Sequence, residues 1–89
     1  MTPRETIKSD IEAKCPTGYS YWRIGLTHDL AESKKYWRDR NQGIGNWAAW
    51  TATSLFDARK LETHFVSEGM KCVTGGDLSQ SEKTYVYVF

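Results

Sequence analysis

The segment YSYWRIGLTHDL, residues 19–30, decides the fold that the sequence predicts. It places two tyrosines, a tryptophan and an arginine just ahead of Gly25. This aromatic-rich run, closed by Gly-Leu-Thr, predicts a strand over about residues 19–26 that ends in a turn. The DLAE that begins at Asp29 is a capping box, which predicts that a helix follows over about residues 30–40.

The rest of the chain alternates between helix and strand patterns. A helix is expected over about residues 3–14, and another is expected to begin at Ser54 and to end near Gly69. Strands are expected at NWAAWTA, MKC and the C-terminal TYVYVF, with a glycine turn after MKC. This order predicts one α+β domain over residues 1–89, with three helices packed on a small, mostly antiparallel sheet of three to four strands.

Composition limits the classes of function. The chain has 89 residues and a net charge of +1, so nucleic-acid binding needs a local basic patch. No apolar run approaches about 18 residues, and the N-terminal segment lacks the apolar core of a signal peptide, so we expect a cytoplasmic protein. Cys15 and Cys72 form no CxxC pair and are expected to be free thiols.

Glu62 breaks the pattern of the third helix. Helical spacing places Leu55, Ala58, Leu61, Phe65 and Val66 on one face, and Glu62 falls inside that face. A carboxylate in an apolar stripe is expensive unless it is paired, hydrogen-bonded, protonated or exposed in a cleft. Two interpretations stay open. The first is a salt bridge to an arginine such as Arg23, or a stripe that is partly exposed to solvent. The second is a carboxylate held at the sheet surface to bind a metal or orient a partner.

The predicted strand at 19–26 has two different faces, because alternate side chains of a strand point to opposite sides. The first face, expected to be core, carries Trp22, Ile24 and Leu26. The second face, polar and aromatic, carries Tyr19, Tyr21, Arg23 and Gly25. We expect this second face to border a cleft that contains Glu62.

Two segments, WRIGLTHDLAESKKYW and DARKLETHFV, resemble the GIY-YIG nuclease superfamily over about residues 21–66. In that family a strand ending in Tyr-Ile-Gly precedes a Thr-containing turn, and the next helix carries an arginine and usually a histidine. A later helix carries a metal-binding glutamate. Ile24, Gly25, Thr27 and Leu30 match the strand end, the turn and the helix start, and Glu62 falls at the glutamate position. The resemblance implies a GIY-YIG-like fold that acts on nucleic acid.

The chain departs from the family at the catalytic positions. Arg23 occupies the tyrosine position, while Ser33 and Trp37 stand near the arginine and histidine positions. The Gly-Ile-Tyr strand is missing from its usual place, and YVYVF has its character, which would resemble a circular permutation. The resemblance therefore implies little or no nuclease activity. In an active enzyme the catalytic residues would be Glu62, Tyr21 and Arg23, with Glu62 the single protein ligand of Mg²⁺.

The segment KKYWRDRNQ, residues 34–42, mixes basic and aromatic side chains. Basic groups bind phosphates and rings stack on bases, so this segment is a candidate nucleic-acid surface. The alternative is a solvated helix face with Trp37 in the core. The candidate binding residues are Lys34, Lys35, Arg38, Arg40 and Tyr36.

Three functions remain open from the sequence. The first is a small GIY-YIG-like nucleic-acid-binding domain with little or no nuclease activity. The second, which the near-neutral charge favours, is a small protein-interaction or inhibitor protein of phage or mobile-element origin. The third is a weak metal-dependent endonuclease that uses Glu62 and Mg²⁺.

Overall fold

The computed structural model describes residues 1–40, 44–74 and 78–89. Its helices are α1 (Arg4–Lys14), α2 (Leu30–Asp39) and α3 (Leu55–Ser67), with a short 3-10 helix η1 at Ile44–Asn46. Its strands are β1 (Arg23–Thr27), β2 (Ala48–Thr51), β3 (Lys71–Cys72) and β4 (Tyr85–Val88). The glycine turn expected after MKC falls on residues that lie partly outside these ranges. No helix of the described residues combines the length and apolarity needed to cross a bilayer.

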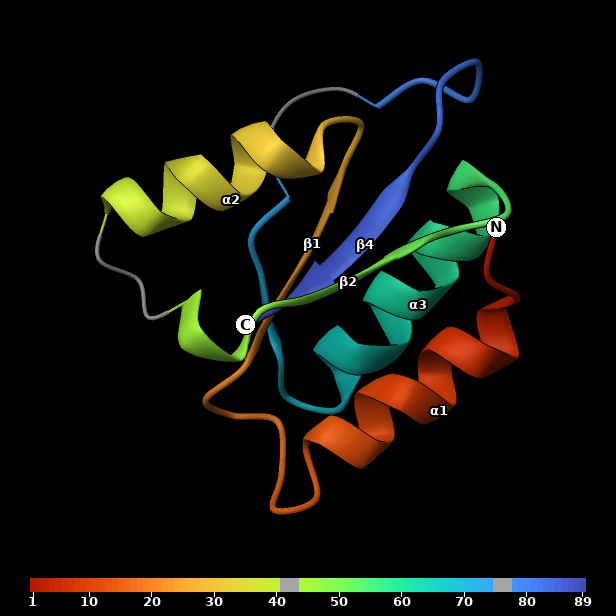
Figure 1. The fold of residues 1–89 in the computed structure, drawn as a ribbon. Helices are drawn as coiled ribbons and strands as arrows, with labels where there is room; N and C mark the ends of the chain where they lie inside the picture. The colour runs from red at the N-terminus through yellow and green to blue at the C-terminus, as the bar shows by residue number, and fades with distance from the viewer. Residues whose placement is uncertain (41–43, 75–77) are drawn as a thin grey trace.

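The described strands form one sheet in the order β2-β4-β1-β3. The C-terminal strand β4 pairs antiparallel with both β1 and β2, whereas β3 pairs parallel with β1. The predicted α+β class with three helices and four strands is confirmed, but the expected mostly antiparallel sheet is wrong, because the sheet is mixed. The physical reason is that α2 and α3 each carry the chain back along the sheet, so β1, β2 and β3 run in the same direction (Figure 1).

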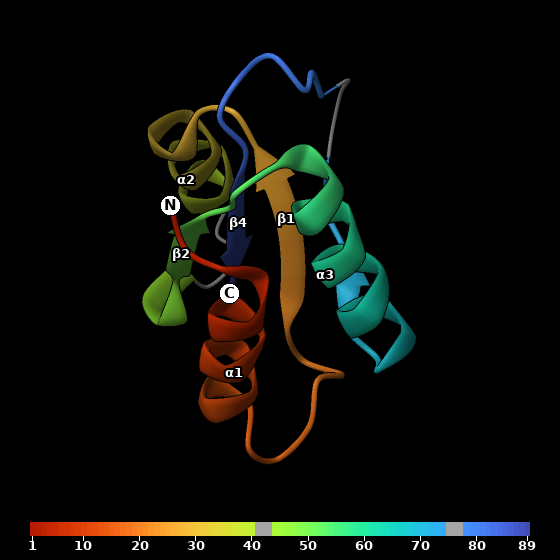
Figure 2. The same ribbon diagram turned by 90° about the vertical axis from the view of Figure 1, so that its right-hand side faces the viewer.

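The helices cover the two faces of the sheet unequally. Helices α1 and α3 lie in front of the sheet in Figure 2, and α2 lies behind it. The main core fills the space between the sheet and the α1/α3 layer. Its most deeply buried side chains are Ile7, Ile11, Ile24, Leu26, Ala58, Leu61, Phe65, Val86 and Val88.

Local sequence explains where α2 and α3 begin. The side chains of Asp29 and Ser54 each accept a hydrogen bond of 3.0 Å from the backbone N–H three residues on, as expected for N-caps. Helix α1 differs, because its N-cap is Pro3 and no side chain caps it. Thr2 instead donates its backbone N–H to the carbonyl of Thr51 at 2.8 Å, which ties the N-terminal segment to the end of β2.

The strand β1 is shorter than predicted. It begins at Arg23, because the backbone N–H of Trp22 bonds the carbonyl of Tyr19 at 3.0 Å and closes a turn over residues 19–22. It lies in one sheet with the C-terminal strand β4, and the two pair antiparallel with Gly25 opposite Tyr87.

Gly25 makes room for an aromatic ring. A Cβ atom at this position would lie 2.3 Å from Cζ of Tyr87, which is closer than any real contact allows. The Tyr87 ring therefore occupies the space above the glycine. It stacks on Trp47 with ring centroids 4.6 Å apart, and its hydroxyl oxygen accepts a hydrogen bond of 3.2 Å from Nε1 of Trp37. A residue of α2 and the residue that leads into β2 are thus both placed by one ring.

We expect Gly25→Ala to lower the free energy of unfolding by about 2 kcal/mol, because the added methyl group overpacks the Tyr87 ring. Gly45→Ala is the matched control, since a Cβ there meets nothing within 4 Å, and its effect should stay within about 0.5 kcal/mol. Urea denaturation measures both. In a Tyr87→Ala background the same Gly25→Ala change should be nearly neutral. An equal cost in the two backgrounds would show that the ring is not the cause.

Candidate functional site

Glu62 lies inside the apolar stripe of α3, as predicted, and is 8% exposed. Its carboxylate accepts hydrogen bonds from the Thr74 hydroxyl and, at 3.3 Å, from the Cys72 thiol. The arginine beside it is Arg59, one turn away on α3, with Nη1 3.4 Å from Oε1. The hydroxyl oxygen of Thr74 also accepts a hydrogen bond of 3.0 Å from the backbone N–H of Leu26. Through Thr74, Glu62 therefore connects α3 to β1.

The other two candidate catalytic residues lie elsewhere. Tyr21 is 95% exposed in the turn before β1. The guanidinium of Arg23 lies 5.5 Å from the centroid of the Phe89 ring, on the side of the sheet that α2 covers. The prediction that the second face of the strand borders a cleft with Glu62 is therefore wrong. Arg23 lies on the α2 side of the sheet, whereas Glu62 lies on the α3 side.

Tyr19 shows why the predicted second face of the strand fails. Its ring packs edge-on against Phe65 of α3, with centroids 5.5 Å apart, instead of joining Arg23 and Gly25 on the α2 side. The alternation of side chains holds only within a regular strand, and residues 19–22 form a turn. Trp22, Ile24 and Leu26 do contribute to the core, as predicted.

The surroundings of Glu62 do not suit a magnesium ion. Mg²⁺ prefers several oxygen ligands in octahedral geometry, and the carboxylate instead meets a thiol, one hydroxyl and a guanidinium. Within residues 1–40, 44–74 and 78–89, no group of three or more His, Cys, Asp or Glu side chains is placed to hold a metal. Both cysteines are free thiols, as expected.

The candidate nucleic-acid-binding residues lie on or directly after α2 and are all exposed. They do not form one unbroken stripe. Nζ of Lys35 and Nε of Arg38 lie 3.8 and 4.0 Å from the Asp39 carboxylate, and such exposed ion pairs are weak. The guanidinium of Arg40 lies 3.5 Å from the centroid of the Tyr36 ring, and Tyr36 is 46% exposed. Trp37, by contrast, contacts the rings of Tyr36 and Phe89 and the hydroxyl of Tyr87.

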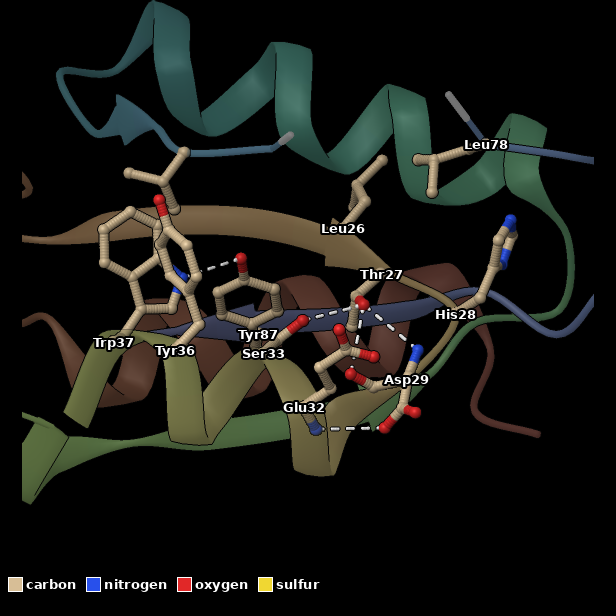
Figure 3. Close-up of a pocket in the computed structure, with 11 residues that line it drawn as sticks. Leu26, Thr27, His28, Asp29, Glu32, Ser33, Tyr36, Trp37, Leu78 and Tyr87 are labelled. Carbon is tan, nitrogen blue, oxygen red and sulfur yellow. Dashed lines mark hydrogen bonds between the residues drawn. The ribbon is translucent and has the colours of Figure 1, made fainter. Parts of the chain in front are cut away.

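A pocket of about 480 Å³ opens between α2 and β1. Figure 3 shows aromatic rings at one end of it and carboxylates at the other. The aromatic end is formed by Tyr36, Trp37 and Tyr87, and the polar end by Thr27, Asp29, Glu32 and Ser33. The pocket includes Ser33 and Trp37, two residues of α2.

The polar end of the pocket is a hydrogen-bonded turn. The hydroxyl oxygen of Thr27 accepts the backbone N–H of Asp29 at 3.0 Å and the hydroxyl of Ser33 at 2.8 Å. Asp29 in turn caps α2. These bonds fix the first turn of the helix to the end of β1, and so they hold the polar end of the pocket in place.

His28 anchors the segment that contains Ser79 and Lys83. Its Nε2 accepts the backbone N–H of Ser79 at 2.9 Å, and its Nδ1 lies 2.7 Å from the carbonyl of Lys83. His28 thus serves structure beside the pocket.

Sequence reasoning missed Tyr87 as a site residue. Burial raises the pKa of its phenol, and the hydrogen bond from Trp37 acts in the opposite direction. One sequence feature does point to this position. A glycine inside a strand often marks a close approach by another group, and Gly25 lies opposite Tyr87.

No protein-family model matches this chain, and neither the curated proteins nor the solved structures contain a match to it. The interpretation of the site therefore rests on its own residues.

The raised pKa of Tyr87 predicts a loss of stability at alkaline pH. The unfolded chain ionises first, at the ordinary value near 10, whereas the buried phenol stays protonated. The free energy of unfolding is therefore unaffected below pH 10 and falls as pH rises from 10 toward the native pKa. Tyr87→Phe removes this proton and should make the alkaline slope shallower by up to about 1.4 kcal/mol per pH unit. Urea denaturation at a series of pH values measures the slope, and identical slopes in the two proteins would contradict the prediction.

Proposed function

We propose that this protein is a small nucleic-acid-binding domain, GIY-YIG-like in fold, with little or no nuclease activity. One observation carries the proposal: α2 and the residue after it present four exposed cations beside Tyr36, an exposed ring that lines the pocket. Cations bind the phosphate backbone and exposed rings stack on bases, and the two together are typical of single-strand binding.

Support for the GIY-YIG-like fold comes from the pairing of the RIGLT strand with the C-terminal YVYV strand. The two strands are antiparallel neighbours over Ile24–Thr27 and Tyr85–Val88, which is the arrangement that a permuted order of strands requires. Support for little or no nuclease activity comes from the positions of the candidate catalytic residues. Glu62 is buried and accepts hydrogen bonds from β3 and the residues after it, and Arg23 and Tyr21 lie away from it.

Binding should depend on salt through the cations of α2. We expect the affinity for single-stranded nucleic acid to fall with salt, with a log–log slope of about −3 to −4 for contacts to four phosphates. The variant with alanine at Lys34, Lys35, Arg38 and Arg40 should lose most of this slope. Fluorescence anisotropy of labelled strands over a series of salt concentrations measures it.

A matched control carries alanine at four other exposed lysines, Lys14, Lys60, Lys71 and Lys83. It removes the same formal charge from other surfaces, so its slope should stay close to that of the unaltered protein. Equal loss of slope in both variants would mean that only net charge matters. Absence of binding to DNA and RNA at low salt would sink the proposal and favour a protein partner.

Nuclease turnover should be absent or very low. Purified protein incubated with plasmid, single-stranded and branched DNA in Mg²⁺ or Mn²⁺ should leave the DNA intact, because the candidate catalytic residues Glu62, Tyr21 and Arg23 do not meet at one place. Glu62→Gln is the informative variant. Cutting by the unaltered protein that disappears in this variant would establish metal-dependent catalysis at Glu62, and cutting that persists would indicate a contaminating enzyme.

A further inference from the structure

The pocket between α2 and β1 has the size and lining of a small-ligand site. Its volume of about 480 Å³ lies within the range of about 300–1,000 Å³ typical of such sites. It combines the aromatic rings of Tyr36, Trp37 and Tyr87 with a small number of polar groups. This combination suits a planar ring that has polar atoms along one edge.

The acidic end of the pocket selects against phosphate. Figure 3 shows the Glu32 side chain turning from α2 into the pocket, whereas the Asp29 carboxylate turns toward the start of the helix, which it caps. Among the described residues, no cation forms an ion pair with Glu32. Its two oxygens are therefore acceptors for N–H donors of a ligand, and they repel an anionic group.

The hydroxyl of Tyr87 supplies the opposite kind of group. Tyr87 is 3% exposed and lines the pocket. Its oxygen accepts from Trp37, so its hydrogen is left for an acceptor. Within the part of the chain that the structure describes, that hydrogen has none. A buried donor without an acceptor is unfavourable, and a carbonyl oxygen of a ligand would satisfy it.

We propose that this pocket binds a guanine base of a single strand, an inference that rests on the proposed nucleic-acid-binding function. Guanine carries a carbonyl oxygen next to two N–H donors on its Watson–Crick edge, which matches Tyr87 as donor and Glu32 as a double acceptor. Adenine has no carbonyl, thymine has no amino group, and cytosine has an acceptor nitrogen between its amino and carbonyl groups.

The same geometry links the pocket to the basic side of α2. Tyr36 lines the pocket while the Arg40 guanidinium covers one face of its ring, so a base can stack on the other face, with the exposed cations of α2 available for its phosphate. Exposed single-stranded bases are commonly read in this way, by stacking and by hydrogen bonds to the Watson–Crick edge. The cations then supply affinity for the strand, and the pocket supplies the preference for guanine.

The test compares oligothymidine strands of equal length that carry one central guanine, adenine or cytosine, or none. The unaltered protein should bind the guanine strand about tenfold more tightly than the others, as for one bidentate base contact. Glu32→Gln should abolish this preference and leave the salt slope unchanged. Glu12→Gln, which alters an exposed carboxylate on α1, is the control and should behave as the unaltered protein does. Tyr36→Ala should weaken binding of the guanine strand by about tenfold through lost stacking.

The outcomes separate this inference from the function on which it rests. Salt-dependent binding that is equal for all four strands, or a guanine preference that survives Glu32→Gln, overturns the pocket assignment and leaves the proposed function standing. If no strand binds, the proposed function fails, and guanosine alone is then titrated with NMR detection of the Trp37 indole N–H. A shift of that resonance that Glu32→Gln removes supports the guanine pocket by itself, and its absence overturns the pocket as well.

Discussion

The contact between Gly25 and Tyr87 is the constraint on which the arrangement of the α2 side depends. A side chain at position 25 would occupy the volume of the tyrosine ring, so β1 and β4 can pair in this register only because the residue is glycine. The Tyr87 ring then supports two other aromatic side chains. Trp37 from α2 and Trp47 from the approach to β2 both contact it, so one cross-strand pair positions a helix and an edge strand together.

The helices on the two sides of the sheet are held by different kinds of side-chain contact. On the α1/α3 side, aliphatic side chains fill the core, and Glu62, the one carboxylate buried among residues 1–40, 44–74 and 78–89, is compensated by hydrogen bonds and one arginine. A charge placed there is tolerated because every partner is near, and its removal from water is offset locally. On the α2 side, large rings stack on one another, and they leave a hollow where the helix begins.

These differences place the candidate function on α2. One helix contributes the cap of its own first turn, the aromatic wall of the pocket and the exposed cations beside it. Its apolar contacts with the sheet are few, and its anchoring relies on Trp37, Ser33 and Asp29. A binding surface on such an element can vary in sequence without disturbing the main core, because that core lies on the other side of the sheet.

The sequence by itself determined the elements, since caps at Asp29 and Ser54 and the alternating YVYV are local patterns that act over a few residues. It also identified Glu62 as a residue out of pattern. Only the tertiary structure decided the direction of β3, the arginine that meets Glu62 and the role of Tyr87. The reason is that these depend on distances between segments far apart in the chain. A glycine inside a strand can mark a close approach by another group, but the ring that fills the space above Gly25 lies 62 residues away, and only the folded chain shows which ring it is.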